Sequence, residues 1–447
     1  MPPAVSAPMD DAALGRAWQD EAPHALLTRL AELPERMGGH PGEARAAALV
    51  AEAFEAAGVT DVETSEFPVR RWDRGDAELA VVAPVERSFE TLALPYSPPG
   101  DVAAELVDVG YGTPDEIDAA DVAGAVAVAS TTTPPDAGRF VHRMEKFGHA
   151  AAAGAEAFVF ANHEPGQLPP TGALRFDAEA AVPGVGVSLE AGEWLRRYAD
   201  RGGRVRLRVD AATRADTSQN VHGVVGPPTD ETVVLLAHYD AHDVAEGALD
   251  NGAGVATVLG AARVLADLDL DCRVRVAAVG CEEVGLVGSA ALADWLDPES
   301  VRAVVNVDGA GRARDLRALT HTSEPLADLA ERVAADAGQP VHVDGEPHPY
   351  SDHWPFLRRG VPALQLHSQP PDGGSRGRGW GHTHADTLDK VDARDLRTHA
   401  MLTALLVRAV AGAEIPRIDP DELRAAMVTA DLEAGMRAAE IWPDGWG

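Results

Sequence analysis

The sequence predicts an α/β protein with a mostly parallel central sheet flanked by helices, and with a smaller α/β domain inserted into it. Short β-branched segments alternate with helical segments over the second half of the chain, and this alternation is typical of parallel sheets covered on both faces. Residues 98–215 are rich in Ala, Gly and Val and interrupt the pattern, which predicts the inserted domain. Several strands end in histidine or carboxylate residues, at the sheet edge where ligands collect in such folds.

The composition of the chain limits the classes of partner that the protein can bind. The chain has 447 residues, 45% of them hydrophobic, which is enough for a large core. Its 71 acidic residues exceed its 38 basic residues and give a net charge of −33. A surface of this sign repels nucleic acid and anionic lipid, because phosphate binding requires clustered Lys and Arg. We therefore expect no nucleic-acid or membrane partner, and we favour adaptation to a high-salt cytoplasm over an ordinary acidic enzyme.

The two cysteines indicate a reducing compartment. Cys272 and Cys281 stand at opposite ends of one predicted strand. Extended chain of that length spans roughly 30 Å, which is beyond disulfide reach. Both are expected to be buried thiols. The first residues lack the features of a secretion signal, and no stretch approaches the ~18 apolar residues of a membrane span, so we expect a cytoplasmic location.

The first 97 residues are expected to form the N-terminal part of the main domain, after a disordered arm at residues 1–9. Apolar residues at helical spacing indicate helices here, and Gly58 is a natural C-cap for the second of them. The predicted elements are helices over residues 10–36 and 44–57 and strands near residues 62–67 and 79–82.

The inserted domain, residues 98–215, is expected to be joined to the main domain by linkers at residues 97–100 and 211–218. The alternative is that its strands simply extend the main sheet. The predicted elements are strands over residues 105–109, 125–129, 157–160 and 182–187 and helices over residues 140–153 and 189–198.

Residues 216–415 carry the alternating pattern and are expected to form the metal-binding part of the main domain. Residues 416–447 add a charged helix and a Trp-Pro-Asp-Gly-Trp tail, which packs either on the body or on a second subunit, so a homodimer is one expectation. The predicted elements are strands over residues 221–225, 233–237, 274–279, 301–307 and 363–366 and helices ending at residue 265 and over residues 287–295, 325–337, 353–359 and 393–410.

Five imidazole and carboxylate side chains near the ends of these strands predict a paired-metal site. Such ligands suit Zn²⁺ where no thiolate is offered, with other divalent metals as the alternative. A carboxylate with two free oxygens can bridge two ions ~3.5–4 Å apart. Asp250 stands just ahead of a helix N-terminus that can orient it for this role. The predicted ligands are His238, Asp250, Glu283, Asp308 and His382.

Each of these residues has an ordinary structural explanation when it is taken alone. Asp250 before a helix is typical of an N-cap, and Asp308 before a glycine is typical of a turn. The pair Glu282-Glu283 is typical of an exposed acidic surface in so acidic a protein. All of these residues lie near the ends of predicted strands in one α/β segment, and this clustering favours the metal site.

Three neighbouring residues receive different assignments. Asp240 joins the catalytic set because it shares a face with His238, so that it, or the chain around it, can accept a hydrogen bond from the ring nitrogen not bound to metal. We assign Glu283 as a ligand and Glu282 as the base that takes a proton from water, although spacing alone permits the reverse. His242 follows a strand and lacks the glutamate of an HExxH motif, so it receives no ligand role.

Six motifs carry a resemblance to a known family: HYD, LDNGAG, CEEVGLVGS, NVDGAG, SDHWPFLRRGVPAL and HTHADTLDKV. In this order and at these separations, over residues 217–410, they resemble the di-zinc exopeptidases, which include bacterial leucyl aminopeptidases, aminopeptidase Y and glutamate carboxypeptidase. The resemblance implies a zinc exopeptidase fold and two zinc ions. It settles the order within the glutamate pair and favours His382 over His384. The implied roles are one zinc for His238 and Asp308, the other for Glu283 and His382, bridging for Asp250, and general base for Glu282.

The inserted residues carry a second resemblance. The segments VDVGYGTPDEIDAADVAGAVAVA, KFGHAAAAGAEAFVFAN and VPGVGVSLEAGEWL resemble a protease-associated domain. The position of the insert, inside the peptidase part, is the one that such enzymes use. The resemblance implies a domain that acts as a lid or as a wall that shapes the substrate site.

We therefore expect an exopeptidase that cleaves peptides by a water activated between two metal ions, and we favour an aminopeptidase. Arg376, Arg378 and Tyr350 could hold a substrate carboxylate, so a carboxypeptidase or dipeptidase is the alternative. A catalytically silent binding protein is disfavoured because every ligand position is filled. A two-metal phosphoesterase is disfavoured by the order of the motifs and by the acidic surface.

Overall fold

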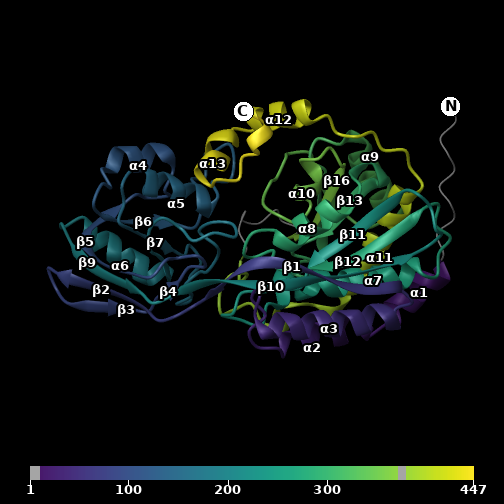
Figure 1. The fold of residues 1–447 in the computed structure, drawn as a ribbon, viewed down its shortest axis with the longest axis horizontal. Helices are drawn as coiled ribbons and strands as arrows, with labels where there is room; N and C mark the ends of the chain where they lie inside the picture. The colour runs from purple at the N-terminus through teal and green to yellow at the C-terminus, as the bar shows by residue number, and fades with distance from the viewer. Residues whose placement is uncertain (1–10, 371–378, 447) are drawn as a thin grey trace.

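The protein folds into two lobes, each built on an eight-stranded sheet with helices packed against it (Figure 1). The computed structural model describes residues 11–370 and 379–446. The N-terminal arm predicted at residues 1–9 lies outside the described residues, as do Arg376 and Arg378.

The sheet of the first lobe has the order β1-β10-β12-β11-β13-β16-β14-β15. Its four central strands run parallel, and antiparallel pairing begins where β10 joins β12 and where β14 joins β16. The mostly parallel central sheet predicted from the sequence is thus confirmed. The strands are β1 (Thr60–Asp73), β10 (Ala212–Val225), β11 (Thr232–His238), β12 (Arg273–Val279), β13 (Val301–Val307), β14 (Asp315–Leu319), β15 (Val341–Asp344) and β16 (Ala363–Gln369).

Helices cover both faces of this sheet, because the side chains of its strands alternate between two separate cores. On β11, Val233, Leu235 and Ala237 pack in the core that contains α7 and α11, whereas Val234 and Leu236 pack against α8 and α10. No helix within the described residues is both long and apolar enough to cross a lipid bilayer. The helices are α1 (Asp11–Gln19), α2 (Ala22–Ala31), α3 (Pro41–Ala56), α7 (Ala253–Leu265), α8 (Val287–Trp295), α9 (Glu324–Ala337), α10 (Trp354–Leu357) and α11 (Ala393–Ala411).

The prediction of a single helix over residues 10–36 is wrong. The chain breaks after Gln19, and the Asp20 carboxylate accepts a hydrogen bond from the Ala22 backbone N–H at 3.0 Å. Pro23 then occupies the first turn of α2, where its missing N–H costs nothing and its ring does not meet a preceding helical turn. Asp20 and Pro23 together divide the predicted helix into α1 and α2.

A long two-stranded ribbon joins the lobes. β1 and β10 pair antiparallel from Thr60 opposite Val224 to Asp73 opposite Ala212, and the ribbon runs from the first sheet towards the second lobe (Figure 1). Residues 211–218 were expected to be a linker, but all except the first belong to β10. That part of β10 is mostly exposed, so its polar sequence hides its pairing with β1.

The second lobe has its own sheet, with the order β3-β2-β9-β5-β6-β7-β8-β4, so its strands do not extend the main sheet. This sheet begins in β2, ahead of the predicted boundary at residue 98, and the domain division itself stays a prediction. The strands are β2 (Ala77–Ala83), β3 (Arg87–Phe89), β4 (Leu92–Ala93), β5 (Gly100–Asp108), β6 (Val126–Ser130), β7 (Ala157–Ala161), β8 (Gly184–Val187) and β9 (Arg204–Val209), and the helices are α4 (Pro114–Ala120), α5 (Arg143–Ala152) and α6 (Leu189–Ala199).

The C-terminal segment packs on the body of its own chain and joins the two lobes. α12 (Pro420–Thr429) and α13 (Glu433–Ala438), yellow in Figure 1, extend from the first lobe to the second. The ring of Trp446 meets Trp354 edge-to-face at 5.9 Å, which anchors the tail on the first lobe. On the second lobe, a Cβ added to Gly148 of α5 would lie 2.0 Å from the Ala438 carbonyl oxygen, so this glycine permits close packing of α5 and α13.

The two cysteines, Cys272 and Cys281, are free and buried, as the sequence predicts. Cys281 lies in the connection that leads from β12 to the glutamate pair. Its backbone N–H and its thiol both point at one oxygen of Glu43, at 3.1 and 3.4 Å. Burial raises the pKa of the Cys281 thiol well above its ordinary value, so the thiol packs in neutral form.

Candidate metal centre

The structure brings the five predicted ligands together at the carboxyl ends of the parallel strands. His238 closes β11, and the chain reaches Glu283 after β12 and Asp308 after β13. These three strands are neighbours in the sheet, so their ends meet at one edge. Asp250 comes from the connection between β11 and α7, and His382 from the connection between β16 and α11.

The first ligand group consists of His238, Asp250 and Asp308, whose ligand atoms lie within 4.8 Å of one another. His238 Nε2 lies 3.4 Å from Asp250 Oδ1 and 3.9 Å from Asp308 Oδ1. All three side chains are largely buried, and the His238 side chain is fully buried. Three donor atoms thus surround one point in the interior, as a metal ion requires.

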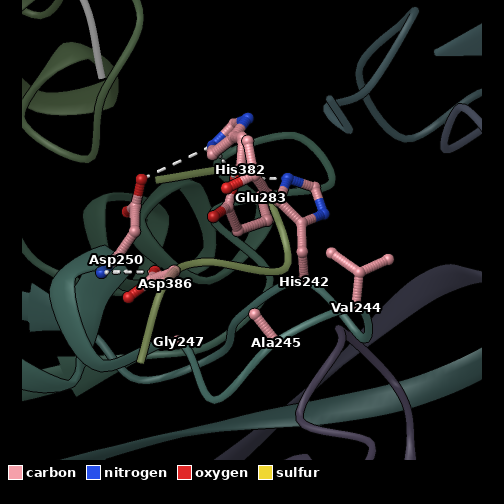
Figure 2. Close-up of a pocket in the computed structure, with 9 residues that line it drawn as sticks. His242, Val244, Ala245, Gly247, Asp250, Glu283, His382 and Asp386 are labelled. Atoms are coloured by element: carbon pink, nitrogen blue, oxygen red, sulfur yellow. Dashed lines mark hydrogen bonds and ion pairs between the residues drawn. The ribbon is translucent and has the colours of Figure 1, made fainter. Parts of the chain in front are cut away.

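The second ligand group consists of His242, Glu283 and His382, with the same 4.8 Å spread (Figure 2). Glu283 Oε2 lies 3.0 Å from Nε2 of both histidines. His382 Nε2 lies 3.5 Å from Asp250 Oδ2. Asp250 therefore turns one oxygen towards each group, which is the arrangement expected of a bridging carboxylate.

Asp240 orients both His238 and the glutamate pair. His238 Nδ1 lies 3.2 Å from the Asp240 carbonyl oxygen and 3.3 Å from its Oδ1. Because these oxygens only accept, Nδ1 carries the proton and leaves the Nε2 lone pair for a metal. The Asp240 carboxylate also accepts hydrogen bonds from the backbone N–H groups of Glu282 and Glu283, at 3.0 and 3.1 Å.

The adjacent glutamates titrate in opposite directions, although both are buried. Burial raises the pKa of Glu282 well above its ordinary value, and the carboxylates of Glu283 and Asp308 act in the same direction. Burial acts to raise the pKa of Glu283 as well, but the imidazoles of His242 and His382 hold it well below its ordinary value. A carboxyl group that stays ionised suits a ligand, and one that takes up a proton readily suits a general base. The electrostatics thus supports the predicted order within the pair.

The backbone around Asp250 is held by a second aspartate from the loop of His382. Asp386 accepts hydrogen bonds from the N–H groups of Leu249, at 2.7 Å, and of Asp250, at 3.1 Å. Asn251 Oδ1 accepts from the Gly254 N–H at 3.1 Å, at the start of α7. Asn251, and not Asp250, accepts this N–H of the first helical turn, so both carboxylate oxygens of Asp250 can face the ligand groups.

Asp308 is fixed by a buried polar chain. Ser351 Oγ donates to Asp308 Oδ2 at 2.7 Å, and Asn306 Nδ2 donates to Ser351 Oγ at 2.7 Å. Gln365 Nε2 also donates to Asp308 Oδ2, at 3.4 Å. One carboxylate oxygen thus accepts these hydrogen bonds while Oδ1 faces His238, as is typical of a ligating carboxylate.

Of the three residues suggested for substrate binding, only Tyr350 lies among the described residues, and it belongs to neither ligand group. Tyr350 is 6% exposed and stacks on His142 of the second lobe, with ring centroids 4.0 Å apart. The prediction for Arg376 and Arg378 stays untested, since they lie outside the described residues. His384, two residues after His382, is exposed.

Sequence reasoning missed two residues at the site. His242 was given no ligand role, yet its ring lies in the second ligand group. The sequence does show a histidine four residues after His238, but it does not indicate the path of the loop between the two residues. Thr171 of the second lobe holds His382 through its backbone alone, at 3.1 Å from Nδ1, and such a contact leaves no mark in the sequence.

The side chains present fit a pair of zinc ions. The donor set combines imidazole and carboxylate, which suits zinc, and it is buried. Among the buried atoms of these side chains, His238 Nε2, His242 Nε2 and Glu283 Oε1 have no hydrogen-bond partner of normal geometry within residues 11–370 and 379–446. Buried polar atoms without partners are costly, and metal ligation would satisfy them. Two ligand groups that share Asp250, beside a glutamate suited to proton transfer, define a two-metal hydrolase.

Comparison with known proteins agrees with this class. Residues 220–407 match the model of Peptidase family M28, and residues 102–195 match the PA domain. Aminopeptidase YwaD of Bacillus subtilis is 27% identical over 91% of this chain and 88% of its own. Carboxypeptidase Q of Mus musculus is 24% identical over 84% of this chain and 82% of its own.

Solved structures give the same result. The aminopeptidase from Aneurinibacillus sp. strain AM-1 superposes with a TM-score of 0.68 at 27% identity, over 92% of this chain and 98% of its own. BSAP, a zinc aminopeptidase from Bacillus subtilis, superposes with a TM-score of 0.68 at 26% identity, over 87% of this chain and 94% of its own. The peptidase part of the chain, residues 220–407, is thus of the family M28 type, and residues 102–195 ahead of it are of the PA domain type. The zinc exopeptidase fold and the inserted protease-associated domain predicted from the sequence are confirmed.

Proposed function

We propose that the protein is a zinc-dependent aminopeptidase, which removes residues one at a time from the free amino end of a peptide. The observation that carries the proposal is the position of Asp250, with Oδ1 3.4 Å from His238 Nε2 and Oδ2 3.5 Å from His382 Nε2. This carboxylate joins the two ligand groups into one centre. The aminopeptidases among the relatives and solved structures support the proposal.

Each residue of the centre has a definable part in hydrolysis. Two zinc ions held here would polarise the scissile carbonyl and lower the pKa of the attacking water. Glu282 accepts the proton of that water and then delivers it to the departing amine. Asp240 positions Glu282 by accepting its backbone N–H, and it sets the tautomer of His238. The metals would be held by His238, Asp308, Glu283 and His382, with Asp250 placed between the two groups.

The charge of the pocket favours a free amino group over a free carboxylate. The described residues that line the pocket beside the second ligand group include Asp250, Glu283 and Asp386, and they include no lysine or arginine (Figure 2). A substrate carboxylate needs a cationic side chain as partner, and the described lining offers none, whereas Asp386 remains as a carboxylate that is not assigned to a metal. The nearby guanidinium of Arg74 already pairs with Asp243 at 2.7 Å.

The decisive experiment compares free-ended and blocked substrates. We expect the purified protein to release the chromophore from an aminoacyl anilide with a free amino group, and not from the same anilide after N-acetylation. Chelation should abolish the release and added Zn²⁺ should restore it. If the protein cleaves N-blocked dipeptides but not the anilide, it is a carboxypeptidase or dipeptidase and the aminopeptidase proposal is wrong. If the zinc-loaded protein cleaves neither substrate, the remaining interpretation is a catalytically silent binding protein.

We further propose a cytoplasmic location and a high-salt environment. The free, buried thiols of Cys272 and Cys281 support a reducing compartment, and the net charge of −33 supports high salt. A homodimer stays a proposal of the same kind, to be tested by light scattering coupled to size exclusion. The C-terminal tail, which was one candidate for the dimer contact, packs on its own chain through Trp446.

A further inference from the structure

His242 lies among the residues that we assign to the second metal. Its Nε2 is 3.0 Å from Glu283 Oε2, and the same oxygen is 3.0 Å from His382 Nε2 (Figure 2). The two imidazole rings meet edge-to-face, with centroids 4.4 Å apart and planes at 81°. Two ring nitrogens and a carboxylate oxygen therefore converge on one region, as ligand atoms do around a metal.

The ring of His242 is buried, and its described neighbours leave its nitrogens poorly satisfied. The side chain is only 4% exposed, and neither ring nitrogen has a hydrogen-bond partner of normal geometry among the described residues. The short contact that Nε2 does make is the ion pair with Glu283 Oε2. A buried imidazole with unsatisfied nitrogens is costly, so a ligand that satisfies Nε2 would be favoured there.

The loop that carries His242 is held on both sides. The next residue, Asp243, accepts hydrogen bonds from Arg74 Nε and Nη2, at 2.9 and 2.7 Å. Arg74 Nη2 also donates to Thr171 Oγ1 at 3.0 Å, which ties the loop to the second lobe. Further along, the Gly247 carbonyl accepts from Arg36 Nη2 at 2.9 Å. His242 is therefore fixed in position before any metal arrives, as a ligand should be.

We propose that His242 is a third protein ligand of the second metal, beside Glu283 and His382, with Asp250 shared between the two sites. This inference rests on the proposed binding of two zinc ions. It gives the second zinc four protein ligands, the full tetrahedral number, whereas the first zinc has His238, Asp308 and the shared carboxylate. A zinc ion with four protein ligands is held more tightly than one with three, so the second zinc would be the tightly held ion and the first zinc the more readily exchanged one.

A zinc titration without substrate tests this assignment. Metal-free wild type, His242→Ala and the matched control His384→Ala, at an exposed histidine of the same region, are titrated with Zn²⁺ against a chromophoric chelator. We expect wild type and His384→Ala to bind one zinc more tightly than the other. We expect His242→Ala to keep the weaker site unchanged and to lose at least about 100-fold in affinity at the tighter site, because even partners outside the ligand set cost 10- to 100-fold. When Co²⁺ replaces Zn²⁺, the visible spectrum of His242→Ala should differ from that of wild type only for the metal equivalent that fills the tighter site.

The assignment is overturned if His242→Ala binds both zinc ions as wild type does, or if the weaker site is the one that is lost. Thermal unfolding of the metal-free proteins in chelator shows whether the variant is folded, and His242→Gln, which preserves side-chain volume, replaces it if it is not. Because no peptide is present, the result is independent of the proposed activity. If the tighter site depends on His242 but the protein cleaves no anilide, the proposed aminopeptidase activity is wrong and the assignment of His242 as a metal ligand still holds.

Discussion

Thr171, in the second lobe, forms two backbone hydrogen bonds with the metal-site residue His382. Its carbonyl oxygen lies 3.1 Å from His382 Nδ1, and its N–H donates to the His382 carbonyl at 2.8 Å. A carbonyl can only accept, so Nδ1 carries the proton and Nε2 is left with its lone pair towards Glu283 and Asp250. The inserted PA domain thereby sets the tautomer and the orientation of one predicted ligand of the peptidase domain.

Loosening the backbone at Thr171 should therefore weaken zinc binding. Thr171→Gly frees that backbone and removes the hydroxyl that accepts from Arg74 at 3.0 Å. We expect a loss of about 10-fold in affinity at the site of His382, measured by zinc competition. Thr171→Ser keeps the hydroxyl and serves as the control. Equal zinc affinity in both variants and in wild type would show that the inserted domain does not control this ligand.

Glu282→Gln should separate metal binding from chemistry. The amide keeps the shape of the side chain but cannot take a proton, so we expect kcat to fall by about 10²–10⁴. Metal analysis should still find two zinc ions per chain, since the ligand in the pair is Glu283. Glu299→Gln, at an exposed glutamate, is the control. Wild-type turnover by Glu282→Gln would remove this residue from the mechanism.

Acid should destabilise the fold through His399. Its Nδ1 accepts from the Gly311 N–H at 3.1 Å, and its Nε2 lies 2.9 Å from the Arg314 carbonyl and donates to it, so the ring is neutral. Burial lowers the pKa of His399 to about 4. The unfolded imidazole has a pKa of about 6.5, so between about pH 6.5 and 4 the unfolded chain binds a proton that the folded chain excludes. The free energy of unfolding therefore falls as the pH is lowered through this window.

Denaturant unfolding at pH 7 and pH 4.5 measures this effect. For His399, the loss of unfolding free energy between the two values should be roughly 2–3 kcal/mol. His399→Gln does not titrate, so its own loss should be smaller than that of wild type by about this amount. His384→Gln, at an exposed position, should behave as wild type. An undiminished loss in His399→Gln would show that other groups carry the acid sensitivity.

Salt should stabilise the protein. Its net charge of −33 places like charges close together in the folded chain. Raising the ionic strength from 0.1 to 1 M shortens the screening length from about 10 to about 3 Å, which reduces this repulsion. We expect the thermal unfolding midpoint to rise with NaCl and to rise less in a nonionic osmolyte of equal osmolality. A midpoint that ignores NaCl would count against high-salt adaptation.

The central strands and the site at their ends could be read from the sequence for a physical reason. The residues of β11 are all buried, so selection for burial produced the unbroken apolar run that predicts a central strand. Parallel strands that are neighbours place their carboxyl ends together, so the residues that follow them, such as Glu283 and Asp308, could be predicted to meet.

What the sequence could not show depends on the path of loops and on backbone contacts. His242 enters the site because Arg74, far away in the chain, holds the neighbouring Asp243, and no periodicity records such a pair. The first half of β10 is polar because it is exposed, so it was read as a linker although it pairs with β1. Thr171 acts on His382 through backbone atoms that every residue possesses.

The insert is attached to the rest of the chain at several separate places: by the paired β1 and β10, by α13 against α5, and by Thr171 against His382. Attachments that lie apart resist rotation about a single hinge. We therefore expect the insert to keep one orientation relative to the metal centre when a peptide binds.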